Sequence, residues 1–139
     1  MRILGLDMGS KRIGLAVSDA LGITAQGLVT LERKDEKTVL EFLKNIIKEK
    51  DVTEIVVGLP LNMDGSSGEQ AKNAEGFADI LKEKFGLPVK LWDERLSTME
   101  VERIMIAGGA SRAKRKKKID KLAAQVILQG YLDSGRKYV

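Results

Sequence analysis

The sequence of 139 residues contains no cysteine and no histidine. The absence of cysteine excludes disulfide bonds and thiolate catalysis, and the two absences together exclude the usual zinc sites. A Ser-His-Asp triad is excluded as well. Any acid–base or metal chemistry must therefore use Asp, Glu, Lys, Arg or Tyr. Oxygen ligands of this kind favour hard cations such as magnesium, manganese or calcium.

Long apolar runs are also missing from the sequence. No run approaches the roughly 20 residues that a membrane span needs. The N-terminus lacks the basic region, apolar core and small-residue cleavage site of a signal peptide. Apolar residues nevertheless make up 43% of the chain, which suits a globular domain with its own core. We therefore expect a soluble, cytoplasmic protein whose residues 1–139 form one domain.

Positive charge is concentrated in one segment. Residues 111–121 hold seven Lys or Arg and one Asp, a net charge of +6, whereas the whole chain carries +4 and the remainder therefore −2. A basic segment of this kind favours a polyanionic partner. A solvated tail is the alternative, but apolar residues continue after the segment, so we place it within the fold.

Hydrophobic periodicity predicts five strands and four helices. Asp35 can cap the first helix, and Ser67 with Gln70 has the spacing of a capping box for the second. Three hairpin-joined strands followed by two strands reached through helices imply an α/β fold, a mixed five-stranded sheet with helices on both faces. The expected strands span 2–8, 13–19, 23–31, 54–59 and 88–92, and the expected helices span 36–50, 69–85, 97–106 and 119–132.

Asp7 stands near the end of the first strand, within the apolar stretch from Ile3 to Val17. A charged carboxylate on a buried strand is costly unless it has a cation, a donor or a ligand. Alternatively, Asp7 starts the following turn and bonds the backbone at Gly9. The residues around Asp7 leave both interpretations open.

Three further acidic residues occupy unusual positions. Asp93 and Glu94 follow the fifth strand, at the sheet edge where ligands of open α/β sheets bind. On a helical wheel, Asp120 falls beside Ala123, Ala124, Ile127 and Tyr131, which is the apolar side of the last helix. For Asp93 and Glu94, the alternative is a polar strand end with a salt bridge to Arg95. For Asp120, the alternative is an acid in the first turn of the helix, where the positive end of the helix dipole favours negative charge.

Asp7, Glu94 and Asp120 would come close if the first and fifth strands end on one edge. Three clustered carboxylates repel one another, and one or two divalent cations relieve that repulsion. Two magnesium ions about 4 Å apart can activate water and stabilise the leaving oxygen of a phosphodiester. The basic segment before Asp120 would then hold the anionic backbone of a nucleic acid at the site.

Four motifs, in this order, resemble the YqgF (RuvX) family, whose members are described as Holliday junction resolvases and as nucleases that process the 5′ end of precursor 16S ribosomal RNA. The resemblance covers essentially the whole chain. The motifs are Asp7-Met8-Gly9-Ser10-Lys11-Arg12-Ile13-Gly14-Leu15-Ala16; Gly58-Leu59-Pro60 with Asn62 and Asp64-Gly65; Asp93-Glu94-Arg95-Leu96-Ser97-Thr98; and Ile119-Asp120-Lys121-Leu122-Ala123-Ala124.

The resemblance implies a ribonuclease H-like sheet with strand order 3-2-1-4-5 and a metal-dependent endonuclease. The matching catalytic and metal-binding positions are Asp7, Glu94 and Asp120, with Mg²⁺ or Mn²⁺ as cofactor. The implied substrate is precursor 16S ribosomal RNA, and the alternative is a four-way junction in branched DNA. A junction resolvase needs two active sites and hence a homodimer, whereas an RNA-processing nuclease can act as a monomer.

Basic residues beside these motifs are candidate substrate ligands. Lys11 and Arg12 lie in the turn after Asp7, where the alternative is two solvated turn residues. The loop from Asn62 to Gly68 is a candidate flap over the site or an ordinary surface loop. The remaining candidate ligands are Arg95, Arg112, Lys114 and Arg115.

Two other functions compete with the nuclease. An Asp-x-Gly-Ser turn between strands also resembles the phosphate-binding hairpin of the sugar kinase and actin superfamily, although only one such hairpin is present. Tight binding of ATP would favour that interpretation. A nucleic-acid-binding module without catalysis would explain the basic segment equally well, but it gives no role to an inward-facing Asp120.

Overall fold

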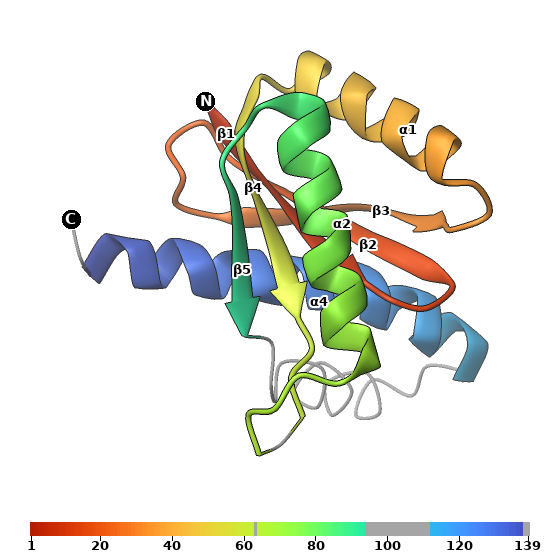
Figure 1. Cartoon of the computed structure of the whole chain (residues 1–139). Coiled ribbons are helices and arrows are strands. Elements are labelled where there is room, and N and C mark those ends of the chain that lie inside the picture. The colour runs from red at the N-terminus through yellow and green to blue at the C-terminus, as the bar shows by residue number, and fades with distance from the viewer. Residues whose placement is uncertain (63, 94–111, 138–139) are drawn as a thin grey trace.

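The computed structural model describes residues 1–62, 64–93 and 112–137, and in the last segment it describes side chains from Leu122 to Ser134. A five-stranded sheet forms its centre (Figure 1), with strand order β3-β2-β1-β4-β5. The order and the α/β fold class agree with the prediction. The strands are β1 (Arg2–Met8), β2 (Arg12–Ser18), β3 (Ala25–Glu32), β4 (Val52–Leu59) and β5 (Val89–Asp93).

Strands β1, β4 and β5 run parallel, whereas β2 and β3 are antiparallel to their neighbours. In the parallel part, Leu6 pairs with Val57, and Leu59 pairs with Asp93. The carboxyl ends of β1, β4 and β5 therefore meet at one edge of the sheet. Asp7 is the next residue after Leu6 and lies at that edge.

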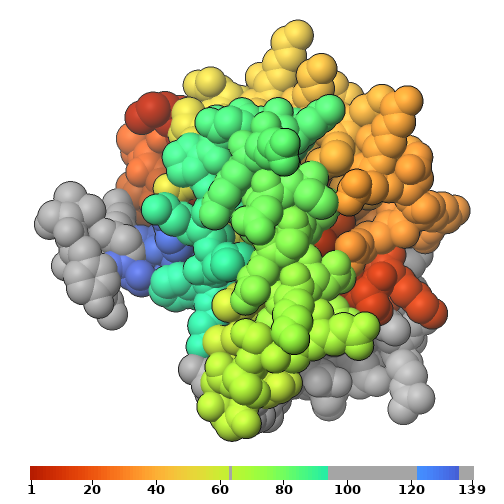
Figure 2. All heavy atoms as spheres, viewed as in Figure 1, coloured from red at the N-terminus to blue at the C-terminus, as the bar shows by residue number. Residues whose placement is uncertain are grey.

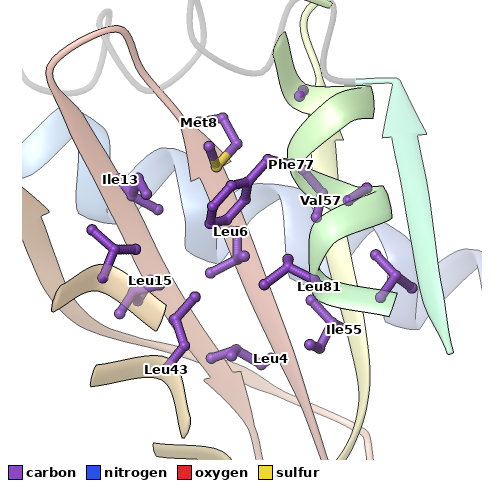
Figure 3. Close-up of a cluster of buried hydrophobic side chains, with 14 of the residues drawn as sticks. Leu4, Leu6, Met8, Ile13, Leu15, Leu43, Ile55, Val57, Phe77 and Leu81 are labelled. Atoms are coloured by element: carbon purple, nitrogen blue, oxygen red, sulfur yellow. The ribbon is translucent and has the colours of Figure 1, made fainter. Parts of the chain in front are cut away.

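Helices α1 (Glu36–Glu49) and α2 (Glu69–Phe85) cover one face of the sheet. As predicted, Asp35 caps α1: its carboxylate accepts hydrogen bonds from the Lys37 amide (3.3 Å) and the Thr38 hydroxyl (2.9 Å). Figure 3 shows the core between the sheet and these helices. Its largest members are Leu4, Leu6, Met8, Ile13, Leu15, Leu43, Ile55, Val57, Phe77 and Leu81.

Helix α4 (Arg112–Lys137) covers the other face. Its buried stripe packs on Ala16 of β2 and Val56 of β4, and this second core contains Ala124, Ile127, Leu128 and Leu132. Gly5 of β1 permits close packing, because a Cβ atom added there would lie 2.9 Å from the Leu128 Cβ. The helix therefore lies directly against the central strand.

Helix boundaries differ from the prediction at two places. Helix α4 begins at Arg112 and not at 119, because Lys and Arg are good helix formers and no Gly or Pro interrupts the chain between 112 and 129. The N-cap of α2 is Gly68, with extended backbone, so Ser67 lies one residue too early to form the predicted capping box.

Part of the prediction falls on residues that the structure does not describe. The expected helix at 97–106 lies outside the described residues. Within the described parts of the chain, no helix is long and apolar enough to cross a membrane.

Candidate active site

Asp7 is half-buried and lies on the α4 face of the sheet. Side chains of a strand alternate between faces. Leu4, Leu6 and Met8 belong to the core beneath α1 and α2 (Figure 3), whereas Gly5 contacts α4. Asp7 shares the parity of Gly5, so its carboxylate lies on the face that α4 covers.

The turn after Asp7 is closed by backbone atoms. The Gly9 amide donates to the Arg12 carbonyl oxygen at 2.8 Å. A Cβ atom at Gly9 would lie 2.6 Å from that oxygen, so only glycine fits here. The Gly9 amide is therefore used by Arg12, and the alternative in which Asp7 starts the turn by bonding Gly9 does not describe this hairpin.

Asp93 ends β5 at the same edge but on the other face. Val89 belongs to the core under α1 and α2, and Trp92 packs with the α4 core. By alternation, Asp93 shares the parity of Val89, and its side chain is exposed. Asp93, the first of the two acids at the end of the fifth strand, thus lies on the face of the sheet opposite Asp7. Glu94 and Arg95 lie outside the described residues.

The path of α4 can be followed from its contacts with the sheet. Tyr131 lies close to Glu54, which pairs with Ile3 at the start of β1. One to two turns earlier, Leu128 and Ala124 contact the position of Gly5. The helix therefore runs antiparallel to β1, and its earlier residues lie nearer the carboxyl end of that strand.

Extending this path by one turn predicts that the backbone of position 120 lies at the level of Asp7. One further helical turn rises about 5.4 Å. The two strand residues from Gly5 to Asp7 span roughly 6.7 Å, a similar distance. The structure describes the backbone of Asp120 but not its side chain.

By helical periodicity, position 120 falls on the same side of α4 as three buried residues that follow it. Ala123 and Ala124, three and four residues later, are 1% and 0% exposed, and Ile127 is 1% exposed. The alternative of a first-turn acid is wrong, because the helix begins at Arg112, eight residues before Asp120, and has no acidic residue in its first turn. The helix dipole thus does not explain an acid at this position.

Aromatic contacts hold the later part of α4 against β4 and β5. The rings of Trp92 and Tyr131 pack edge to face, with centroids 5.8 Å apart and planes at 86°. Burial, and to a smaller extent the hydrogen bond and charge of Glu54, raise the pKa of Tyr131 to about 12. The Tyr131 hydroxyl is therefore protonated at neutral pH and can donate to Glu54.

Candidate substrate ligands belong to the β1–β2 turn and to the first turn of α4. Lys11 is exposed at the tip of the β1–β2 turn, and Arg12 is half-buried and pairs with Glu32 across β2 and β3. Arg112, Lys114 and Arg115 belong to the first turn of α4, so the basic segment is helical, and their side chains are not described.

Sequence reasoning missed Arg33. Its Nη1 donates to the Gly9 carbonyl oxygen at 2.8 Å, and its amide donates to the Lys11 carbonyl oxygen at 2.8 Å. Arg33 directly follows β3, and only the register of β2 against β3 shows that it lies beside the turn after Asp7. The one signal in the sequence was that Arg33 is a basic residue shortly after the third expected strand.

The loop from Asn62 to Gly68 is held by its own hydrogen bonds. The Asn62 amide donates to the Ser66 carbonyl oxygen (2.9 Å), and the Gly65 amide donates to that of Asn62 (2.8 Å). The Asp64 carboxylate accepts from the Ser66 amide (2.9 Å). The role of this loop as a flap over the site stays a prediction.

The sheet order and the helices on its two faces define a ribonuclease H-like fold. The structure of Thermus thermophilus RuvC in complex with a Holliday junction substrate superposes with a TM-score of 0.59 at 16% identity, covering 98% of this chain and 96% of that one. The fowlpox virus Holliday junction resolvase superposes with a TM-score of 0.54 at 13% identity, covering 96% and 99%. At these identities the likeness concerns the fold.

The model of the RuvX family, described as Holliday junction resolvase, matches residues 1–134, and this chain belongs to that family. Relatives named "Putative pre-16S rRNA nuclease" are closely similar over the full length. The protein of Geobacillus kaustophilus is 57% identical, covering 98% of this chain and 100% of the relative. That of Halothermothrix orenii is 53% identical, covering 99% and 98%.

Proposed function

We propose that this chain is a divalent-metal-dependent endonuclease whose cleavage site contains Asp7, Glu94 and Asp120. The observation that carries the proposal is the contact of Ala124 and Leu128 with Gly5, from which the path of α4 leads toward Asp7 on the same face of the sheet. Membership of the RuvX family and the names of its close relatives support a nuclease.

The three acids suit a hard divalent cation. All three offer carboxylate oxygens, and the chain has no His or Cys that would favour a softer metal. Asp93 is the less suitable of the two acids after β5, since it lies on the opposite face from Asp7. When bound, Mg²⁺ or Mn²⁺ would supply activation of water and stabilisation of the leaving oxygen.

The protein residues would position the substrate. Asp7 is held on a central strand between two paired neighbours, so its backbone has little freedom to move. Basic side chains at the hairpin tip and at the start of α4 would hold phosphates on either side of the cleaved bond. These ligands are Lys11, Arg12, Arg95, Arg112, Lys114 and Arg115.

The substrate we propose is the 5′ end of precursor 16S ribosomal RNA, which the names of close relatives support. A branched DNA junction is the second candidate, and the description of the family supports it. The two candidates differ in the number of active sites needed, one in a monomer or two in a homodimer.

Cleavage by wild type and by Asp7→Asn tests the proposal. The assay uses a structured precursor RNA and a four-way DNA junction, each with Mg²⁺ or Mn²⁺. We expect Asp7→Asn to lose activity by roughly 100-fold or more, because even an indirect partner of a metal contributes 10–100-fold. Preferential cleavage of one substrate by wild type identifies the physiological class.

Asp79→Asn is the matched control, because Asp79 is an exposed acid on α2 and its replacement changes the charge equally. Its activity should equal that of wild type. Equal activity of Asp7→Asn and wild type on both substrates would show that this site is not the nuclease centre.

A further inference from the structure

A group of basic side chains lies beside the β1–β2 turn, on the side of Asp7 away from β4 and β5. A hollow of about 330 Å³ at this place is lined by four basic residues, one acidic residue and one serine. In Figure 2 the red atoms of the turn and the orange atoms after β3 lie close together at the right of the molecule. The lining residues are Ser10, Lys11, Arg12, Glu32, Arg33 and Lys34.

Backbone pairing brings these charges together from two separate strand ends. The Arg33 amide donates to the Lys11 carbonyl oxygen, and Arg12 pairs with Glu32 in the sheet. The backbone positions of Lys11 and Arg33 are therefore set by the hairpin, and Lys34 follows Arg33 in the short connection to α1. A fixed group of cations loses less freedom when it binds an anion than a mobile group does.

The Arg33 guanidinium is oriented toward this turn. It is half-buried, and its Nη1 donates to the Gly9 carbonyl oxygen, two residues after Asp7. A guanidinium has five N–H donors. In the part of the chain that the structure describes, this is the one hydrogen bond of its side chain, so further donors can reach a phosphate.

Arg33 also lines a second hollow, of about 710 Å³, between Ser10 and the first turns of α2. Lys72 and Asn73 contribute to it, together with Glu69 and Gln70. The acidic residues only partly offset the cations. Glu32 forms an ion pair with Lys34 at 3.5 Å, but both side chains are largely exposed, and such pairs are easily exchanged for another anion.

We propose that Lys11, Arg33 and Lys34 form a second contact surface for the phosphate backbone of the nucleic acid, on the β2–β3 side of the cleavage site. This surface lies at the β1–β2 turn and the end of β3, whereas the basic segment belongs to the first turns of α4. The proposal rests on the proposed nuclease function, and it adds the place where the strand beyond the cleaved bond is held.

The test is the salt dependence of binding, measured without divalent metal by fluorescence anisotropy. The probes are a labelled RNA hairpin and a labelled four-way DNA junction. Removing two phosphate contacts should reduce the slope of log K against log salt by roughly 1.4 to 1.8. When the salt concentration rises from 50 to 200 mM, wild type should therefore lose affinity by a factor about ten times larger than Arg33→Gln/Lys34→Gln does.

Lys44→Gln/Lys84→Gln is the matched control, because both lysines are exposed and line a different hollow between α1 and α2. This control variant removes the same charge, and its slope of log K against log salt should stay at the wild-type value. Since Arg33 also anchors Gly9, the second variant Lys11→Gln/Lys34→Gln keeps that anchor and should show a similar reduction.

If both test variants keep the slope of the control on both probes, the proposed contact surface is wrong. Separate cleavage measurements distinguish this failure from failure of the nuclease proposal. A wild type that cleaves, with variants of unchanged slope, overturns the contact surface alone. A wild type that cleaves neither probe, with variants of reduced slope, leaves the surface standing and overturns the nuclease.

Discussion

At the scale of single residues, Gly5 sets how closely α4 approaches β1. It is buried two residues before Asp7, and its missing side chain leaves room for the Leu128 side chain and the Ala124 carbonyl oxygen. The same contact positions the helix that carries Asp120. A change at Gly5 should therefore affect both stability and the proposed site.

We expect Gly5→Ala to lower the free energy of unfolding by about 1–3 kcal/mol, because the added methyl group overpacks the interface with Leu128. Cleavage should fall further than stability explains, since α4 must shift. Urea denaturation and the cleavage assay measure the two effects.

Gly76→Ala is the control for Gly5→Ala. Gly76 is exposed within α2, and beyond its chain neighbours and the adjacent backbone of the helix nothing lies within 4 Å of a Cβ atom placed there. Alanine should raise the free energy of unfolding by about 0.5–1 kcal/mol, because glycine is unfavourable in a helix interior. A Gly5→Ala protein as stable as Gly76→Ala would contradict the close packing of α4.

At the scale of elements, two glutamines fasten α4 to the start of β3. The Gln129 Oε1 accepts from the Ala25 amide (2.9 Å), and its Nε2 donates to the Ile23 carbonyl oxygen (2.9 Å). The Gln125 Nε2 donates to the Ala25 carbonyl oxygen (3.1 Å). These two glutamine side chains therefore form hydrogen bonds with the backbone of the edge strand β3, bonds of the kind that a neighbouring strand would form.

Gln129→Ala should therefore lower the free energy of unfolding by about 1–3 kcal/mol, because it leaves the amide of the buried Ala25 without its acceptor. Urea denaturation measures the change. Gln26→Ala, an exposed change on the same strand, should cost much less. Equal effects of the two substitutions would argue against the fastening role of Gln129.

At the scale of the whole molecule, Tyr131 connects α4 with β4 and β5 through Glu54 and Trp92. Its pKa is raised to about 12, mainly by burial, so the folded protein holds the phenolic proton more tightly than the unfolded chain, where the pKa is about 10. The resulting stability is fully present below pH 10 and is lost as the pH rises through 12.

Wild type should therefore lose stability more steeply between pH 10 and pH 12 than Tyr131→Phe, which has no phenolic proton. The measurement is the urea midpoint of both proteins across that range. The difference between the two urea midpoints should be constant below pH 10. Parallel curves through pH 12 would show that the Tyr131 proton is not linked to folding.

Local features of the fold were predictable because they depend on neighbouring residues. The strand at 2–8 and the helix at 69–85 match β1 and α2, and Asp35 caps α1 as expected. The start of α4 was misplaced because the last helix was predicted to begin only after the run of basic residues. The helical propensity of Lys and Arg is high, and the repulsion between like charges along a helix is only a few tenths of a kcal/mol per pair, about 0.2–0.5.

The candidate site was predictable only in part. The apolar stripe of the last helix indicated that Asp120 faces the sheet, and the burial of Ala123, Ala124 and Ile127 agrees with that stripe. The separation of Asp93 from Asp7 follows from strand parity across the sheet. The approach of Arg33 to Gly9 follows from the register of β2 against β3.

By itself, then, the sequence determined the five strands and the helices α1 and α2, because periodicity and propensity act over one or two turns. It also determined that carboxylates must do any metal chemistry, since His and Cys are absent. Only the tertiary structure decided which acids and cations share the edge beside Asp7. Those neighbours depend on strand register and on the packing of α4 against Gly5, which join residues far apart in the chain.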